Sequence, residues 1–240
     1  MKLCDLHTHV LPGVDDGAPT MEYALQMLKN AVASDVECLA ITPHCNSPHG
    51  IGNYLDQDLK DRFSQLQKMA EALPIRLVLG AEVFVNEEFP EYLKRNMFPT
   101  INNSRYLLTE FLPNTEEELF GDTLQLILES GKIPLIAHPE RYAAVARTPH
   151  IVEEWLDLGC HIQLTGGSIL GVYGKTVQKT AAVLLKNDYV ACVASDAHGV
   201  HRRSNYLMDI YDHLAIRYSK GYAQHLMYLN PMRICLDETL

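Results

Sequence analysis

The stretch Lys2-Leu-Cys-Asp-Leu-His-Thr-His9 carries the pattern that decides the fold: a short apolar run that ends in histidines. The run Lys2–Leu6 has the length and composition of a buried β-strand. His7 and His9 follow it, and because side chains two residues apart in an extended chain point to the same face, both imidazoles can approach one metal ion. Other strands that end in the same way can complete such a metal site.

The same unit, an apolar strand followed by a loop and an amphipathic helix, recurs along the whole chain. The expected strands are Lys2–Leu6, Val36–Thr42, Ile75–Gly80, Tyr106–Glu110, Ile133–Ala137, His161–Leu164 and Val190–Ser195. The expected helices are Thr20–Ser34, Leu55–Ala72, Glu87–Lys94, Thr115–Ser130, Pro149–Leu158, Lys175–Asn187 and Asn205–Lys220. Strands that alternate with helices predict a parallel α/β fold, either an open sheet or a closed barrel.

Local sequence signals mark two helix boundaries. Thr115 is expected to cap its helix, with Glu116–Glu118 over the positive helix end and Gly131 just past the last residue. Asn230-Pro231 is expected to stop the last helix, which leaves a short closing segment after it.

A histidine or a carboxylate stands at or just beyond the C-terminal end of all but one of these strands. The residues are His7, His9, His44, Glu82, Glu110, His138, Asp196 and His198, with Asp16 in the first loop. Parallel α/β proteins place function at these ends. In an open sheet of seven strands they would spread over roughly 29 Å, at about 4.8 Å per strand. A closed barrel gathers them at one mouth, so we predict a (β/α)7 barrel with residues 1–240 as one domain.

The donor set points to a metal centre. Nitrogen and carboxylate ligands without cysteine suit manganese, iron or zinc. Asp5 shares the face of His7 and His9, where it either orients a ligand histidine or is a buried structural residue. His49, His201 and Lys175 are left open as contacts to a substrate.

Two arginines are expected beside this mouth. Arg141 follows His138 by three residues, and Arg203 follows His198 by five, with Arg202 as its alternative. A guanidinium offers a rigid fork of donors that suits phosphate. Arginines around a metal site with several ions therefore indicate a phosphoester substrate.

Composition limits the partners and the compartment. Twenty Lys and Arg against thirty Asp and Glu give a net charge of -10, which argues against nucleic acid as the main partner. No apolar run approaches the ~18 residues of a membrane span, and no secretory signal is evident, so a cytoplasmic location is expected. The six cysteines contain no Cys-x-x-Cys pair and are expected to be buried, reduced thiols.

These motifs resemble the PHP superfamily (polymerase and histidinol phosphatase domains), and within it the bacterial manganese-dependent protein-tyrosine phosphatases of capsule and exopolysaccharide systems, the CpsB/CapC type. The matching segments are Asp5-Leu-His-Thr-His9, Leu11-Pro-Gly-Val-Asp-Asp-Gly17, Thr42-Pro-His44, Gly80-Ala-Glu82, Glu110-Phe111, His138-Pro-Glu-Arg-Tyr142, Gly166-Gly-Ser-Ile-Leu-Gly-Val-Tyr-Gly-Lys175 and Ser195-Asp-Ala-His198. His-x-His is common to the superfamily, whereas the segments around Asp16, Arg141 and Lys175 are more specific. The family often continues with proline after the second arginine, where this chain has Ser204.

The resemblance implies a distorted (β/α)7 TIM-like barrel with three divalent ions, manganese above iron or zinc. One ion would lie among His7, His9, Glu82 and Asp196, a second among Glu82, Glu110 and His138, and a third among Asp16, His44 and His198. Arg141 and Arg203 would grip the phosphate while a metal-activated hydroxide attacks phosphorus. The implied substrate is phosphotyrosine in the tyrosine-rich tail of a bacterial kinase that regulates capsular or exopolysaccharide synthesis.

Two other functions stay open. One is a small-molecule phosphomonoesterase, such as a histidinol-phosphate phosphatase, and the other is a non-catalytic, metal-stabilised module that binds a partner protein. Two further phosphatase chemistries do not fit. No cysteine is followed six positions later by arginine, and Asp56-Gln-Asp58 opens a helix instead of ending an apolar strand.

Overall fold

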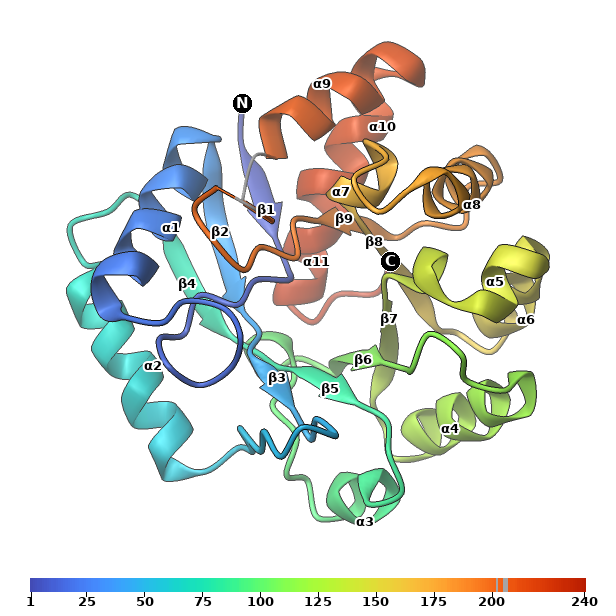
Figure 1. The fold of residues 1–240 in the computed structure, drawn as a ribbon, viewed down its shortest axis with the longest axis horizontal. Helices are drawn as coiled ribbons and strands as arrows, with labels where there is room; N and C mark the ends of the chain where they lie inside the picture. Colours follow the sequence, from blue (N-terminus) through green and yellow to red (C-terminus); the bar gives the residue numbers. More distant parts are fainter. Residues whose placement is uncertain (202, 205–206) are drawn as a thin grey trace.

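Parallel β-strands form a ring that helices surround on the outside (Figure 1). The computed structural model describes residues 1–201, 203–204 and 207–240. Its strands are β1 (Leu3–Asp5), β2 (Val36–Ile41), β3 (His44–Cys45), β4 (Arg76–Leu79), β5 (Glu82–Phe84), β6 (Tyr106–Glu110), β7 (Ile133–Ala137), β8 (His161–Thr165) and β9 (Cys192–Ala194). The expected strands match these positions to within two residues at most ends.

The strands occupy seven positions around the ring, because β3 continues the position of β2 and β5 continues that of β4, both beyond the ends of the expected strands. The strand orders are β1-β2-β4 and β3-β5-β6-β7-β8-β9, with every described pairing parallel. Pro43 separates β2 from β3, and Gly80-Ala81 separates β4 from β5. The carbonyl of Pro43 still accepts the N–H of Glu82 at 3.1 Å, so pairing continues across the interruption.

The ring closes between β9 and β1. An isolated parallel bridge joins Thr8 to Ala197. The N–H of His9 donates to the carbonyl of Ala197 at 2.8 Å, and that of Asp196 donates to the carbonyl of His7 at 2.9 Å. The expected distorted seven-stranded barrel is therefore confirmed.

The helices cover the outside of the ring in chain order (Figure 1). They are α1 (Met21–Ala33), α2 (Gln57–Met69), α3 (Phe89–Lys94), α4 (Glu117–Glu129), α5 (Ala143–Arg147), α6 (Val152–Asp157), α7 (Gly166–Ile169), α8 (Lys175–Lys186), α9 (Leu207–Arg217), α10 (Lys220–Gln224) and α11 (Asn230–Cys235), with short 3-10 turns at Ile101–Asn103, Pro139–Arg141 and Pro149–Ile151. The helix expected from Asn205 is seen as α9, and Asn205 itself lies outside the described residues.

Two apolar layers hold the ring together. Alternate strand residues fill its interior: Cys4, Leu6, Cys38, Ala40, Val78, Tyr106, Leu108, Leu135, Ala137 and Cys192, with Ile234 and Cys235 of α11. A larger cluster, which includes Leu39, Ile136 and Leu184, packs the outer face of the strands against the helices. This division follows from the two-residue period of a strand in a barrel.

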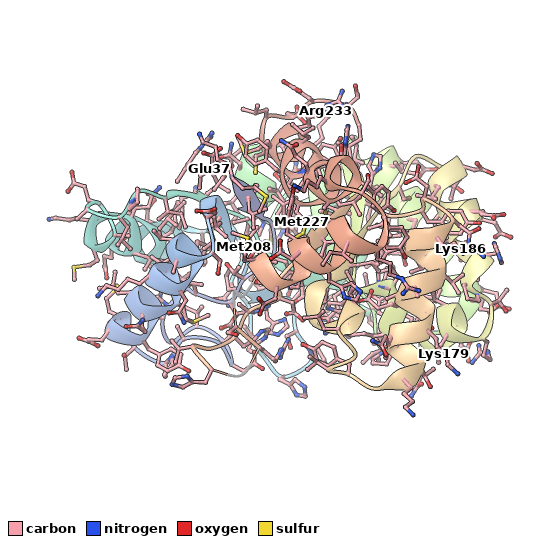
Figure 2. The ribbon with its side chains drawn as sticks, turned by 90° about the horizontal axis from the view of Figure 1, so that it is seen from above. Glu37, Lys179, Lys186, Met208, Met227 and Arg233 are labelled. Atoms are coloured by element: carbon pink, nitrogen blue, oxygen red, sulfur yellow. The ribbon has the colours of Figure 1, made fainter. Side chains whose placement is uncertain are left out.

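The two ends of the ring are built differently. α11 contacts β1 and lies over the N-terminal ends of the strands. Figure 2 shows Glu37 of β2 and Arg233 of α11 together at this end, with Lys179 of α8 at the other side of the molecule. The opposite end of the ring is open to the loops that follow the strands.

The α4 boundary differs from its prediction at one end. Glu116, with extended backbone, is the N-cap residue, and no side chain caps the helix. Thr115 lies one residue earlier, where its N–H closes a turn onto the carbonyl of Leu112 at 3.0 Å. The cap predicted at Thr115 is therefore wrong, whereas Gly131 has the left-handed φ of 79° expected after the helix end.

Asn230-Pro231 does not stop the last helix, which corrects that prediction. The chain is helical from Lys220 to Cys235, and a π-helical segment, His225–Leu229, joins α10 to α11. Pro231 stands in the first turn of α11, where a missing N–H costs little. The π-helical segment lies directly before the proline, so the change from α- to π-type hydrogen bonds and the proline fall within one stretch of the helix.

Among the described helices, none is long and apolar enough to cross a membrane. All six cysteines are free and buried, as expected.

Candidate metal centre

The open end of the ring gathers all nine of the expected metal ligands. They are His7, His9 and Asp16 after β1, His44 in β3, Glu82 in β5, Glu110 in β6, His138 after β7, and Asp196 and His198 after β9. His7, His9, Glu82 and Asp196 are almost fully buried. Asp16 is the most exposed, with 63% of its side chain accessible.

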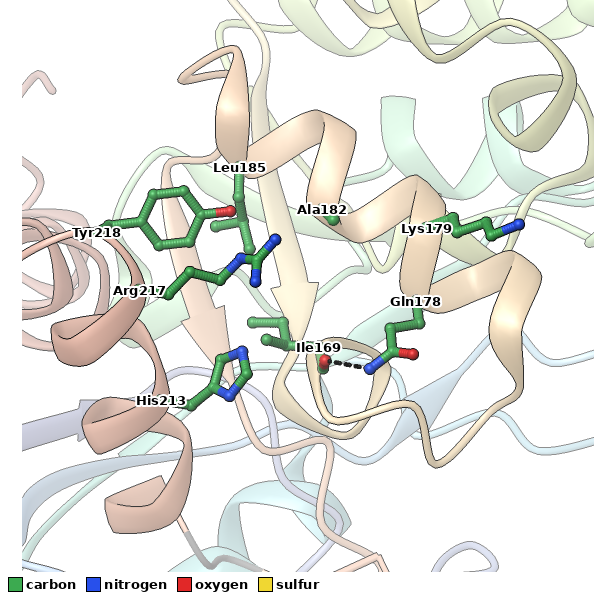
Figure 3. A pocket seen from close by; sticks show the side chains of 8 residues that line it. All are labelled: Ile169, Gln178, Lys179, Ala182, Leu185, His213, Arg217 and Tyr218. Carbon is green, nitrogen blue, oxygen red and sulfur yellow. Dashed lines mark hydrogen bonds between the residues drawn. The ribbon is translucent and has the colours of Figure 1, made fainter.

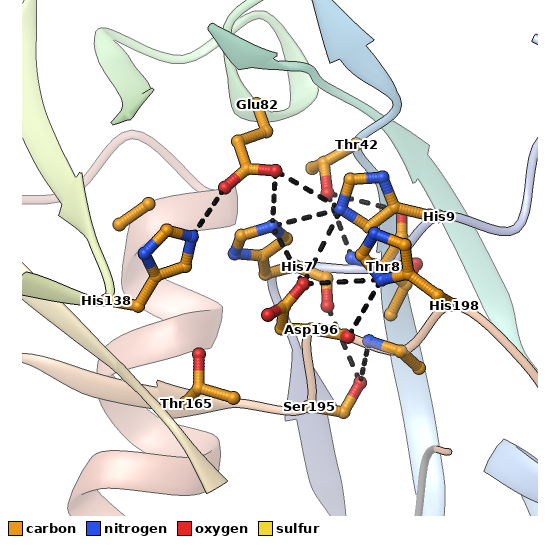
Figure 4. Close-up of polar contacts among 12 residues, drawn as sticks. His7, Thr8, His9, Thr42, Glu82, His138, Thr165, Ser195, Asp196 and His198 are labelled. Atoms are coloured by element: carbon orange, nitrogen blue, oxygen red, sulfur yellow. Dashed lines mark hydrogen bonds and ion pairs between the residues drawn. The ribbon is translucent and has the colours of Figure 1, made fainter. Parts of the chain in front are cut away.

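Four donor atoms from three strand ends face one point (Figure 4). The Nε2 atoms of His7 and His9 lie 3.2 Å apart. Oε2 of Glu82 lies 3.1 and 3.2 Å from these two nitrogens, and Oδ1 of Asp196 lies 3.6 Å from each. This two-nitrogen, two-oxygen set encloses a point that a cation can occupy.

Glu82 connects this group to a second one. Its other oxygen, Oε1, lies 2.8 Å from Nε2 of His138, which is also 3.7 Å from Oε1 of Glu110. His44 closes the gap on a third side, with Nδ1 3.0 Å from Oε2 of Glu82. The carboxylate of Glu82 therefore lies at the centre of the cluster.

A third group lies at the rim. Oδ1 of Asp16 is 3.3 Å from Nε2 of both His44 and His198. The His198 ring stacks on that of His9, with centroids 3.7 Å apart. Together, His9, Asp16, His44 and His198 present four donor atoms within 4.8 Å of one another.

Two of the gathered residues have left-handed backbone. His138 has φ 34° and Asp196 has φ 54°, which non-glycine residues rarely adopt. The N–H of His138 donates to the carbonyl of Gln163 at 2.8 Å. Such conformations persist only where the surroundings fix them, and they concentrate at functional sites. Here they turn the chain at the ends of β7 and β9.

Two residues that the sequence did not single out orient the central histidines. Nδ1–H of His9 donates to Oδ2 of Asp15 at 2.8 Å, and Nδ1–H of His7 donates to Oε1 of Gln163 at 2.9 Å. These partners assign the tautomers in which both Nε2 atoms carry lone pairs toward the cluster. Gln163 could have been found as the polar residue of an apolar strand, whereas nothing distinguished Asp15 from Asp16.

Two roles were left open for Asp5, and the structure supports the structural one. Its Oδ1 accepts the N–H of Ser195 at 3.0 Å, and its Oδ2 accepts the hydroxyl of Ser195 at 2.6 Å. From His7, Asp5 accepts the backbone N–H, at 3.4 Å, and no hydrogen bond from the imidazole ring is seen. Burial raises the pKa of Asp5 to about 6. Asp5 therefore joins β1 to the end of β9 and does not orient an imidazole.

The cluster is electrostatically strained without a cation. Burial lowers the pKa of His7, but Glu82 and Asp196 outweigh it and raise that pKa to about 9. For His44, burial is likewise outweighed by Glu82 and Asp16, and the pKa rises to about 11. Burial and the charge of Glu82 raise the pKa of Glu110 to about 8. Protons thus supply the positive charge that these crowded carboxylates require.

Both expected arginines reach the cluster through Asp196. Nη2 of Arg141 lies 2.7 Å from Oδ2 of Asp196, and Nη2 of Arg203 lies 2.8 and 2.9 Å from its two oxygens. The Arg141 guanidinium also stacks over the ring of Tyr173 at 4.1 Å. Arg202, the alternative to Arg203, lies outside the described residues.

The three residues left open fall in different places. His201 lines a cavity of about 590 Å³ with Arg203, Tyr173, Leu170 and other residues, directly beside the arginines. His49 is exposed in the turn at residues 47–50, and Lys175 is the exposed first residue of α8. Of the three, only His201 borders the site.

A second cavity of about 320 Å³ lies away from this centre, between α8 and α9 (Figure 3). Gln178 of α8 lies on the side that faces His213 and Arg217 of α9, whereas the end of the Lys179 side chain points away from them. None of the nine gathered residues lines this cavity, so it is not part of the candidate metal centre.

Comparison with known proteins places the chain among bacterial phosphatases. It is 31% identical to the tyrosine-protein phosphatase CpsB of Streptococcus pneumoniae, over 99% of this chain and 100% of that one. It is 32% identical to the tyrosine-protein phosphatase YwqE of Bacillus subtilis, over 84% of this chain and 80% of that one.

The fold agrees with a solved structure. A crystal structure described as YwqE from Bacillus subtilis and CpsB from Streptococcus pneumoniae, unique metal-dependent tyrosine phosphatases, superposes with a TM-score of 0.89 at 27% identity. The match covers 99% of this chain and 96% of that one. The model of the capsular polysaccharide synthesis family CpsB/CapC matches residues 3–236. The chain therefore belongs to the CpsB/CapC family.

Proposed function

We propose that this protein is a metal-dependent protein-tyrosine phosphatase. The convergence of buried imidazoles and carboxylates on common points, with two arginines at the rim, supports this activity. Relatives that match 97% or more of the chain carry the name tyrosine-protein phosphatase. A phosphatase needs a strongly positive pocket for a dianionic phosphomonoester, and this arrangement supplies one once cations are bound.

The donor chemistry fits divalent metal ions. Nδ1–H of His198 donates to the carbonyl of Asp196 at 3.0 Å, which leaves its buried Nε2 facing Oδ1 of Asp16 at 3.3 Å, so both atoms can bind the same ion. We infer three ions, held by His7, His9, Glu82 and Asp196, by Glu82, Glu110 and His138, and by Asp16, His44 and His198. Manganese suits this nitrogen-plus-carboxylate set, and iron or zinc are the alternatives.

The protein's own contribution to the reaction is to place positive charge around the phosphate group. Bound divalent ions supply a water nucleophile at neutral pH and stabilise charge on the transferred phosphoryl group. Three ions give +6 and the four carboxylates Asp16, Glu82, Glu110 and Asp196 give -4, so the loaded centre carries about +2 before substrate enters. Arg141 and Arg203 add donors for the non-bridging phosphate oxygens. The ring of Tyr173 lies under the Arg141 guanidinium and contributes a cation–π contact.

We further infer that the substrate is a phosphotyrosine protein, namely the tyrosine-rich tail of a bacterial tyrosine kinase that regulates capsular or exopolysaccharide synthesis. The family name and the relatives' names support this inference. The cavity beside Arg203 and Tyr173 offers Leu170 and Val172 as apolar contacts for residues next to the phosphotyrosine. The six unpaired cysteines fit a reducing cytoplasm.

The decisive experiment compares substrates on the manganese-loaded protein. We expect turnover of phosphotyrosine peptides with a kcat/KM well above that for histidinol phosphate. A strong preference for histidinol phosphate would favour the small-molecule phosphatase instead. Metal-loaded protein that hydrolyses neither compound would favour the non-catalytic binding module. An anomalous-scattering map of the same sample would give the number and identity of the ions.

A further inference from the structure

A second cluster of metal-binding side chains lies at the opposite end of the ring, inside its apolar core. Cys4 of β1, Cys38 of β2 and Cys235 of α11 have sulfur atoms that all lie within 4.8 Å of one another. The three thiols are buried, with 0%, 1% and 2% of each residue exposed. They belong to the interior layer of the ring, and none of them contacts the candidate metal centre.

The fold brings these thiols together from distant parts of the sequence. Cys4 and Cys38 are direct partners in the parallel pairing of β1 with β2. Cys235 reaches them because α11 lies across the N-terminal ends of the strands, where Asn102 donates its side-chain N–H to the Cys235 carbonyl at 2.8 Å. Figure 2 labels Glu37 and Arg233 at this end of the ring. Glu37 directly precedes Cys38, and Arg233 lies two residues before Cys235.

The spacing suits one thiophilic ion. Zinc lies about 2.3 Å from each thiolate sulfur, so three such sulfurs around one ion stand roughly 3.8 to 4.0 Å apart. Sulfur atoms already within 4.8 Å need only small side-chain rotations to reach that arrangement. Thiolates select soft or borderline ions, whereas the nitrogen and oxygen donors at the other end of the ring suit harder ones.

The charges also suit a divalent ion. Three thiolates and one divalent ion leave a single negative charge. Arg76, the pairing partner of Cys38 in β4, lies beside the cluster and supplies a compensating positive charge.

We propose that Cys4, Cys38 and Cys235 form a second, structural metal site that binds one divalent thiophilic ion such as Zn²⁺. The site ties the C-terminal helix α11 to strands β1 and β2 at the end of the ring that carries no catalytic groups. It is independent of the proposed phosphatase activity, because its ligands and its position are separate from the candidate metal centre.

Cobalt absorption tests the proposal on the complete protein. Reduced protein, with its other metal sites filled by manganese, is titrated with Co²⁺ while the near-ultraviolet thiolate-to-cobalt charge-transfer band is recorded. Nitrogen and carboxylate ligands give no such band, so cobalt at the other centre does not interfere. We expect a band that saturates at one equivalent of cobalt. Wild-type protein that shows no band overturns the proposal.

Matched cysteine variants locate the ligands. The band should be lost in Cys38→Ser and in Cys235→Ser and kept in Cys160→Ser, a cysteine equally buried but in the outer apolar layer. An unchanged band in Cys38→Ser and Cys235→Ser overturns the assignment. Zinc X-ray absorption on the wild-type protein gives a check that needs no variant. A shell of three sulfurs supports the site, and a shell of nitrogen and oxygen alone excludes it.

Discussion

Glu82 is the residue on which the candidate metal centre depends most. Each of its two oxygens faces a different group of donors, with His138 on one side and His7, His9 and His44 on the other. A carboxylate can bridge two cations in this position because it carries a charge and two equivalent oxygens. An amide of the same shape has neither property.

We therefore predict that Glu82→Gln reduces phosphotyrosine-peptide turnover by roughly 10² or more, the size of effect seen when one charge-stabilising group is removed from an active site. Metal analysis should show loss of bound ions in the same variant. Glu71→Gln, on the exposed surface, is the matched control and should retain both properties. Full metal content together with full turnover in Glu82→Gln would contradict the bridging role.

Asp15 acts on the metal centre through His9. Its carboxylate accepts the Nδ1–H of His9 and the backbone N–H of His44, and so it fixes one ring and one strand end. Asp15→Asn keeps the shape but presents an N–H₂ group that favours the opposite His9 tautomer, with a proton on Nε2. We predict a loss of about 10- to 100-fold in metal affinity, typical of such orienting partners.

A metal titration of activity tests this prediction for Asp15. The variant should need more manganese for half-maximal turnover and should recover much of its rate at saturation. Asp58→Asn, in the exposed first turn of α2, controls for the loss of one negative charge. An Asp15→Asn titration curve that overlies the wild-type curve would show that the His9–Asp15 bond does not matter.

The sequence predicts the ligands better than it predicts their supports. His7, Glu110 and Asp196 could be located because their positions follow from where apolar runs end, and a closed ring places all such ends together. Asp15 and Gln163 reach the histidines only because of the direction in which a loop and a strand side chain point. That direction is set by packing between segments as far apart as His7 and Gln163, which no local pattern contains.

At the scale of elements, the first loop after β1 is the most constrained. Gly17 lies so close to His9 that an added Cβ would stand 2.0 Å from the His9 carbonyl oxygen. The same loop donates Gly17 N–H to Asp15 and Ala18 N–H to that His9 carbonyl. The glycine is therefore required for the close approach that seats Asp15 and Asp16.

We predict that Gly17→Ala lowers both the melting temperature and the metal content, because the backbone of His9 cannot yield to the new methyl group. Gly121→Ala is the matched control, since nothing lies within 4 Å of a Cβ at that position in α4. The control should gain about 0.5–1 kcal/mol of stability from better helix propensity. Equal melting temperatures and metal contents for Gly17→Ala and wild type would contradict this account of the loop.

Helix and strand positions were predictable, but their interruptions were not. Apolar periodicity located β6 and β7 without error in their bounds. Pro43 lies between β2 and β3, just past the expected strand Val36–Thr42, and Pro231, which was expected to stop the last helix, lies inside a continuous helical segment. After Pro43 the parallel pairing resumes between β3 and β5, and this continuation depends on tertiary contacts that a local pattern does not contain.

At the scale of the whole molecule, the acidic composition and the anionic substrate are compatible because of where the charge lies. The chain carries -10 overall, and three divalent ions would bring it to about -4. Four of the carboxylates are at the metal centre, so the mouth of the ring becomes positive while the outer surface remains acidic. The net charge of the whole chain therefore indicates whether a partner such as nucleic acid is favoured. It does not indicate the sign of the charge at a local site.

Metal loading of the whole protein should release protons and should depend on pH. In the metal-free protein His7 and His44 have pKa values of about 9 and 11, above the 6.5 of an unfolded chain, so both are protonated at pH 7. Their contribution to the stability of the metal-free fold is complete below pH 6.5 and is lost as pH rises through these values. Metal ions bind only neutral imidazole, so the stability that bound metal adds to the fold increases as pH rises.

We predict that the difference in melting temperature between manganese-loaded and EDTA-treated protein widens steadily from pH 6.5 to pH 9. The reason is that binding must displace the protons of His7 and His44, which becomes easier as their pKa values are approached. Calorimetric titration with Mn²⁺ at pH 7 in two buffers of different ionisation enthalpy should show release of about three protons, two from these imidazoles and one from Glu110, whose pKa is about 8. A difference that is constant over this pH range, with binding heats independent of the buffer, would mean that the histidines are already neutral and that carboxylate crowding does not govern metal binding.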